Sequence, residues 1–567
     1  MENRPPFAVL LILLLMRCFV VFITLVSALA FPLAGASQIP LGTSQRARSE
    51  VATDTLEEFI EAAQHSINIV SNGNTLVPML PAGVSGYSTY PEQLNQIFSH
   101  ARSLARAGKA TRIVVFVHGG LNTAEAGRRR VARLVKKMKA DGCYPIFINW
   151  DSGMVSTVGE SLLAHQGRIA PVNLLSGVTW GPLNFTTNLA TAAVRAPLYI
   201  ANYVPSTVWY QLHLNHSTLY SDGSTTPTPW HLQPGVNAVN DQTRALYLLY
   251  HAAGGSGVEA PLQMGLGAYT LPKGQSAGSV LLAPLYITVR PFTTYLLYAF
   301  GKPAWDNMLR RTRVMFIQPT PQGNQMQKIP GEYAKQTQRT RKGPDTPTDP
   351  ALDPYQRYGS NRGVVPQFMD SLVAFQRKQK LVSRPVTVDL IGHSMGSIVL
   401  NEAIGNYCDS LEVSNLVYMG GACSVYDFRT KVVPYLQHHR QMKFYNLTLH
   451  PYREVTESHF LGCAPQGSLL CYIDELLTTP LTPQDRTLGR WHNFILATKD
   501  PDFLPADVRG RVTLKGFGAA EKDAGPQQHG EFGALPFWRP CTWEVPDAAC
   551  LPTMELELVD WLKWEKS

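Results

Sequence analysis

The sequence contains none of the short motifs that mark nucleotide or zinc chemistry. It has no G-x-x-x-x-G-K-[ST] phosphate loop, no G-x-G-x-x-G after an expected strand, no H-E-x-x-H and no cysteine pair with C-x-x-C spacing. These absences argue against a phosphate-binding loop, a dinucleotide site and a zinc site. We therefore expect neither a cofactor nor a metal ion.

Charged residues are also scarce, at 16% of the 567 residues against 45% hydrophobic residues. This composition is typical of a globular chain with a large core and excludes a disordered one. The net charge of +8 is a mild excess for this length, and the basic clusters at 128–137 and 339–342 contain no aromatic residue. A solvated helix face and a polar loop explain these clusters better than a nucleic-acid surface, so no nucleic-acid partner is expected.

The N-terminal segment is the longest stretch with almost no charge, since Arg17 is the only charged residue between positions 7 and 36. From Met16 onward it has the basic start, apolar run and small-residue cleavage site of a signal peptide. The alternative is a retained membrane anchor, although an arginine in the bilayer costs roughly 2.5–3.5 kcal/mol. Either way, we expect residues 1–36 to export the protein, which would be periplasmic, secreted or membrane-anchored.

Seven cysteines follow Cys18, an odd number. Cys463 with Cys471, and Cys541 with Cys550, are close enough in sequence to pair across loops, which would suit an oxidising compartment. The sequence leaves open whether these disulfides form.

Apolar runs typical of buried strands alternate with helical patterns in two blocks of the chain. The first block has strands expected at 112–117 and 144–150 around a helix at 124–140, which is a βαβ unit. The second block has strands expected at 386–391, 415–419, 443–449 and 511–516, with helices near 364–380, 395–407 and 431–439. Sequential units of this kind predict an α/β fold with a doubly wound, mostly parallel sheet.

Between the two blocks the alternation stops for more than 200 residues. The apolar stretch 280–300 contains Arg290 and two prolines, a composition that fits a cap or lid, and we expect it to contact a membrane surface. A polar, proline-rich connector follows at 318–354. The expected division is a signal peptide or anchor (1–36), the N-terminal part of the core (37–151), the cap insertion with its connector (152–355) and the C-terminal part of the core (356–567).

The strand expected at 386–391 runs directly into the pentapeptide G-H-S-M-G at 392–396, and a helical segment follows. This is the G-x-S-x-G nucleophile elbow, in which serine lies on a sharp strand-to-helix turn and the glycines leave room for neighbouring backbone. The N-terminus of the helix directs N–H groups toward a developing oxyanion. The pattern predicts Ser394 as a nucleophile.

A second motif, His118-Gly119-Gly120, follows the strand at 112–117. Glycines at this point let backbone N–H groups approach a substrate oxygen. We expect the N–H groups of Gly119, Gly120 and Met395 to form an oxyanion hole, and His118 to brace the loop.

These two motifs resemble the lipase and esterase branch of the α/β-hydrolase superfamily. The resemblance covers roughly residues 110–150, 385–455 and 510–540. It implies an α/β-hydrolase fold and a catalytic triad in the order serine, acid, histidine. The long insertion before the elbow departs from a compact member of that superfamily and leaves the shape of the substrate pocket open.

The resemblance places the acid after the strand at 443–449, where Glu454 is the first candidate and Glu457 the second. Asp427, one strand earlier, is the third. It places the histidine just after the last strand, where His529 is preferred to His492, which precedes that strand.

The expected function is an exported serine hydrolase that cleaves carboxylic esters with a lipid-like acyl group through an acyl-enzyme. Two alternatives remain. One is an acyltransferase that uses the same triad, and the other is a non-catalytic envelope protein that binds lipid or protein partners on this scaffold. The combination of elbow, glycine loop and histidine argues against the non-catalytic protein.

Overall fold

The computed structural model describes residues 61–75, 89–108, 112–122, 124–153 and 277–317, most of 362–544, and short pieces between 156 and 232. The expected signal peptide or anchor at 1–36 lies outside this part of the chain. No helix within the described part is both long and apolar enough to cross a membrane.

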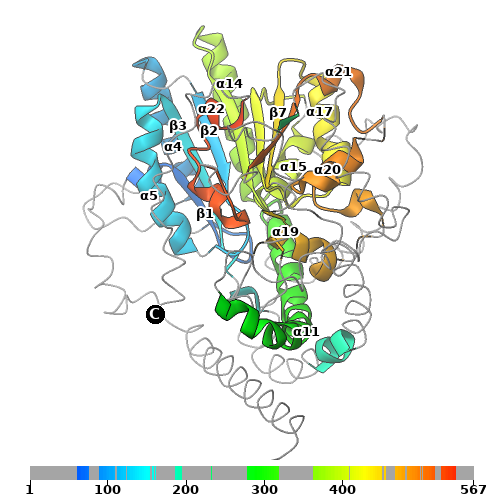
Figure 1. Ribbon diagram of the computed structural model, residues 1–567. Coiled ribbons are helices and arrows are strands. Elements are labelled where there is room, and N and C mark those ends of the chain that lie inside the picture. Colours follow the sequence, from blue (N-terminus) through cyan, green and yellow to red (C-terminus); the bar gives the residue numbers. More distant parts are fainter. Residues whose placement is uncertain are drawn as a thin grey trace, which may run out of the picture.

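Seven parallel strands form an open sheet, shown in Figure 1, in the order β1-β3-β2-β5-β6-β7-β8. Two-residue strand β4 (His231–Leu232) pairs antiparallel with β8 at the edge. The parallel strands are β1 (Ser66–Ile69), β2 (Arg112–Val117), β3 (Cys143–Trp150), β5 (Thr387–His393), β6 (Asn415–Met419), β7 (Lys443–Leu449) and β8 (Val512–Phe517). All six strands expected from the sequence are present, and the predicted α/β fold with a mostly parallel sheet is confirmed.

The larger helices also follow the prediction, since those expected at 124–140, 364–380 and 395–407 begin and end within one residue of these positions, and a further long helix, α4, precedes β2. These helices are α4 (Tyr90–Arg106), α5 (Ala124–Ala140), α14 (Val364–Leu381) and α15 (Gly396–Asn406). Local sequence explains where α4 begins, because Thr89 and Glu92 form a capping box there.

Shorter helical segments follow β6, β7 and β8. After β6 they are α16 (Val425–Asp427), η3 (Phe428–Val432) and α17 (Val433–His438). After β7 they are α19 (Leu469–Tyr472), η5 (Ile473–Leu477), η6 (Pro483–Asp485), α20 (Trp491–Ala497) and α21 (Ala506–Arg509), and after β8 they are η7 (His529–Ala534) and α22 (Pro540–Trp543).

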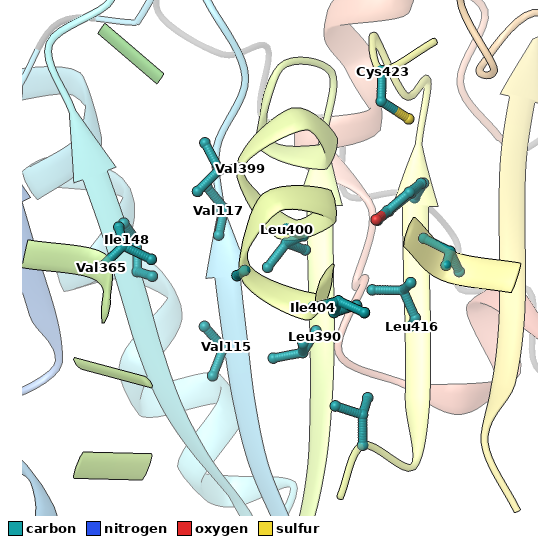
Figure 2. Close-up of a cluster of buried hydrophobic side chains, with 14 of the residues drawn as sticks. Val115, Val117, Ile148, Val365, Leu390, Val399, Leu400, Ile404, Leu416 and Cys423 are labelled. Carbon is teal, nitrogen blue, oxygen red and sulfur yellow. The ribbon is translucent and has the colours of Figure 1, made fainter. Parts of the chain in front are cut away.

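The sheet is covered on both faces, and alternate residues of each strand point to different cores. Val115 and Val117 of β2 pack with Val399 and Leu400 of α15, as Figure 2 shows. Phe116 of β2 belongs to the opposite cluster, which contains side chains of α5, η7 and α22. Because both faces are buried, the strands read in sequence as unbroken apolar runs.

A 38-residue helix, α11 (Ala277–Val314), contains the whole apolar stretch 280–300 that we expected to act as a cap or lid. Trp305 and Met308 of this helix lie in the same core cluster as β2 and α15. The buried guanidinium of Arg311 pairs with Glu160 at 2.7 Å. The second half of α11 is therefore anchored to the sheet, while side chains before residue 293, and with them much of the expected membrane contact, lie outside the described residues.

Candidate active site

Ser394 lies between the last residue of β5 and the first residue of α15, with a φ angle of +51°. The left-handed conformation costs a non-glycine residue roughly 1–2 kcal/mol. Backbone hydrogen bonds hold it there. Its N–H donates to Met419 O at 2.9 Å, and its carbonyl accepts from Ala422 N–H at 3.0 Å. The strained turn is thus fixed by the adjacent strand β6 and the loop that follows it.

The two glycines of the elbow allow α15 to pack directly against the neighbouring backbone. A Cβ atom on Gly396 would lie 2.1 Å from Val117 O, and one on Gly392 would lie 2.9 Å from Ser397 N. Both positions are too close for any side chain. The G-x-S-x-G spacing therefore has a steric cause in this structure.

The Ser394 side chain is buried, with 2% of the residue exposed, and points toward the loop after β2. Its Cβ is 2.7 Å from the position that a Cβ on Gly119 would occupy. Its hydroxyl oxygen makes no hydrogen bond to any described residue. The structure thus brings together the serine and the glycine loop that the sequence predicted to meet.

His118 braces this loop, as expected. Trp150 N–H donates to His118 Nε2 at 2.9 Å, so the ring proton is on Nδ1, which donates to Gly119 O at 2.6 Å. Burial lowers the pKa of His118 to about 3, so the ring is neutral at physiological pH.

The three N–H groups expected to form the oxyanion hole lie around the Ser394 turn. Within the described part of the chain, the N–H groups of Gly119, Gly120 and Met395 donate to no backbone carbonyl. A Cβ on Gly120 would lie 2.8 Å from Met395 Sδ and 3.3 Å from Met308 Sδ. The loop is therefore flanked by two flexible thioethers, one of them from α11.

His529 begins η7, after β8, and lies at the same edge of the sheet as Ser394. A Cβ on Gly420 would be 2.8 Å from His529 Cε1, and Gly420 directly follows the β6 residue that accepts the Ser394 N–H. The ring centroids of His529 and His393 are 5.4 Å apart. The fold therefore places His529 next to the nucleophile elbow.

The two candidate glutamates have different partners. Glu457 Oε2 accepts a hydrogen bond from the backbone N–H of His529 at 3.0 Å. Glu454 accepts one from the Ser468 hydroxyl. Burial raises the pKa of Glu457 to about 8 and that of Glu454 to about 7. The structure thus places the carboxyl of Glu457, the second candidate, against the backbone of His529.

The remaining candidates lie elsewhere or are not described. Asp427 ends α16, where burial raises the pKa of its carboxyl and the charged groups that act on it are those of Lys431, Glu402 and Arg313. His492 is in α20, and its side chain lies outside the described residues.

A buried ionic cluster supports the loop behind His529, and sequence reasoning missed it. Asp474 accepts hydrogen bonds from Thr487 N–H at 2.8 Å, Asn493 Nδ2 at 2.8 Å and Arg490 at 3.1 Å. Gly489, between two of these partners, donates its N–H to Gly421 O at 2.8 Å. Only the spacing of polar residues at 487–493 hinted at a shared carboxylate.

One of the two disulfides left open by the sequence does not form. Cys471 is a buried free thiol whose sulfur lies 3.4 Å from Glu454 O, so the pairing with Cys463 is wrong. The sulfur instead packs against the segment that contains Glu454. Cys550, the expected partner of Cys541, lies outside the described residues.

The residue types that meet around Ser394 are the ones that nucleophilic chemistry uses. The site combines a buried hydroxyl on a strained turn, a neighbouring imidazole, a buried carboxyl and a loop with available N–H groups. No family model, curated protein or solved structure matches the chain.

Proposed function

We propose that the protein is a serine hydrolase with an α/β-hydrolase fold that cleaves carboxylic esters through an acyl-enzyme on Ser394. The observation that carries this proposal is the left-handed conformation of Ser394 at the end of a central strand, against Gly119. Strain of this kind persists where the surrounding structure enforces it and is concentrated at functional sites. A serine needed only for packing would not require a strained, left-handed backbone conformation.

In the proposed mechanism, His529 accepts the Ser394 proton while Oγ attacks the ester carbonyl carbon. The imidazolium then protonates the leaving alcohol, and water cleaves the acyl-enzyme by the same route, releasing the acid. The contact with the His529 backbone favours Glu457 over Glu454 as the acid. Although burial keeps Glu457 neutral near pH 7, an adjacent imidazolium would stabilise its ionised form, so the two charges would develop together.

The negative charge on the carbonyl oxygen would be stabilised by the N–H groups of Met395 and the glycine loop. Loss of one such donor typically costs about 2.7–4 kcal/mol of transition-state stabilisation. The thioethers of Met308 and Met395 lie beside Gly120. These apolar neighbours support an apolar acyl or alkyl group as part of the substrate.

A fluorophosphonate probe tests the proposal, because it forms a bond only with an activated serine. We expect stoichiometric labelling of the wild type and none of Ser394→Ala. The matched control is Ser397→Ala, which removes another buried hydroxyl of the same turn. If folded wild type is not labelled, the alternative of a non-catalytic binding protein is favoured over a serine hydrolase.

A series of p-nitrophenyl esters tests the substrate class. We expect octanoate to be cleaved with a higher kcat/KM than acetate, and equal or better turnover of acetate would exclude the preference for apolar acyl groups. Acyl transfer to an added alcohol in preference to water would identify an acyltransferase.

Export belongs to the same proposal and rests on residues 1–36 alone. Removal of this segment should leave the protein in the cytoplasm of an expressing cell. Unchanged fractionation of the truncated chain would exclude the segment as the export signal.

A further inference from the structure

The loop after β2 is held by hydrogen bonds that fix the direction of its peptide groups. Nδ2 of Asn122 donates to Gly119 O at 3.1 Å and to Gly120 O at 2.9 Å. In a trans peptide, the N–H points opposite to the preceding carbonyl. The N–H groups of Gly120 and Leu121 are therefore turned away from Asn122.

The orientation of the Asn122 amide is itself determined. Its Oδ1 accepts from Arg130 Nη2 at 3.2 Å, and arginine can only donate, so the NH₂ group must face the loop. The Asn122 N–H lies 3.2 Å from Ser152 Oγ, and its carbonyl accepts from Ser152 N–H at 3.1 Å. Every polar group of Asn122 is thus engaged.

These contacts hold a strained backbone. Leu121 has a φ angle of +63°, and 45% of the residue is exposed, so apolar burial does little to offset the cost of this conformation. The polar contacts of Asn122 on either side of Leu121 supply the stabilisation that the side chain of Leu121 does not.

Arg130 brings a positive charge to this network. It forms no ion pair within the described part of the chain, and its Nη1 is shielded from solvent without a hydrogen-bond partner there. Burial lowers its pKa to about 10, which leaves it charged at neutral pH. Because Arg130 is partly buried, solvent screens its charge incompletely, and the charge acts through Asn122 on the glycine loop.

We propose that Asn122 is a positioning residue for the oxyanion hole: it turns the N–H groups of the glycine loop toward the reacting oxygen, and Arg130 strengthens them electrostatically. This inference rests on the proposed serine hydrolase function. As positioning residues, both should act on the transition state more than on substrate binding.

The rate of phosphonylation by a fluorophosphonate tests the inference, because the phosphoryl oxygen develops charge in the same hole. Asn122→Asp keeps the size of the side chain and its contact with Arg130 but removes both N–H donors. We expect labelling about 10²-fold slower than in wild type, with Ser394 still fully labelled at the end. With p-nitrophenyl butyrate, kcat should fall by a similar factor while KM stays unchanged.

Arg130→Met should slow labelling about 10-fold, since the amide donors remain but the charge is lost. The matched control is Arg129→Met, an exposed neighbour on α5 with the same change in charge, which should stay within twofold of wild type.

The outcomes separate this inference from the proposed function. An unlabelled wild type contradicts the function itself. A labelled wild type with an equally fast Asn122→Asp variant overturns the inference, as does a rise in KM at constant kcat. If Asn122→Asp fails to fold, the Arg130→Met and Ser152→Ala variants test the inference instead. Unchanged labelling rates in both variants would overturn the inference.

Discussion

The two sides of Ser394 are held in place by different physical means. On the side of β2, the loop from His118 to Asn122 is fixed mainly by hydrogen bonds between neutral groups, and Arg130 is a charged group that bonds to it among the described residues. On the side of β7, the segment that contacts His529 is held by buried glutamates and by the cluster around Asp474 and Arg490.

This difference separates the parts of the site that respond to pH from the parts that do not. His118 is neutral and Arg130 is charged throughout the physiological range, so the geometry of the glycine loop should not titrate. The pKa values of Glu454 and Glu457 are raised to about 7 and 8 by burial. We therefore expect the pH dependence of both activity and stability to come from the β7 side of the site, which contains Glu454 and Glu457.

The largest effect is expected on the β7 side of the site. Glu457→Gln should slow labelling of Ser394 about 10³-fold, because His529 would lose the carboxyl that we propose stabilises its charged form. Glu454→Gln, an identical change in a carboxyl that contacts Ser468 instead, should stay within tenfold. Labelling rates of the two variants measure the difference, and the reverse order would assign the acid to Glu454.

The elbow between the two sides should tolerate no side chain at its second glycine. Gly396→Ala should lower the free energy of unfolding by about 3 kcal/mol or more, because the added Cβ meets the rigid backbone oxygen of Val117 at 2.1 Å. Gly405→Ala in the same helix meets only the flexible Lys431 side chain and should be neutral or stabilising. Urea unfolding compares the two, and equal stabilities would contradict the close packing of α15 on β2.

The buried glutamates should make the fold less stable as the pH rises. An unfolded glutamate titrates near about 4.3, whereas burial raises the pKa of Glu454 to about 7 and those of Glu457 and Glu475 to about 8. Between these values the folded chain binds more protons than the unfolded chain, so the free energy of unfolding falls with pH. Urea unfolding should show higher stability at pH 5 than at pH 8.

Glu475→Gln provides the control for this titration. It removes one of the three carboxyls, so the free energy of unfolding should fall less steeply with pH than in wild type. Stability that rises from pH 5 to pH 8 would show that other groups dominate.

The smallest effect is expected in the glycine loop. Leu121→Gly should raise the free energy of unfolding by about 0.5–1 kcal/mol, because glycine adopts a φ of +63° without strain and the lost side chain is largely exposed. Thermal unfolding gives the stability, and the labelling rate shows whether the loop keeps its geometry. A destabilised variant would mean that the Leu121 side chain contributes packing that offsets its strain.

Several features of the site follow from local sequence. The buried strands were predictable because both faces of the sheet are covered and the runs are continuously apolar. The position of Ser394 was predictable because a strand, two glycines and a helix leave little choice of turn. β1 escaped prediction, because the four residues S-I-N-I are too short to distinguish from a loop.

Other features depend on contacts between distant segments. Glu457 and His529 are 72 residues apart, and no spacing rule distinguishes Glu457 from Glu454. Asn122 reads as an ordinary loop residue, and its role emerges only when α5 places Arg130 beside it. That Cys471 is a buried free thiol likewise follows from its packing against the segment that contains Glu454.

The sequence by itself determined the order of the strands along the chain, the alternation with helices and the location of the strained serine. These depend on periodicity and on steric limits that act over a few neighbouring residues. The tertiary structure decided which carboxyl meets His529, which carbonyls Asn122 holds and which polar groups are buried. Those outcomes depend on how far apart the folded chain places groups that the sequence separates by tens or hundreds of residues, and hydrogen bonds act only at contact distance.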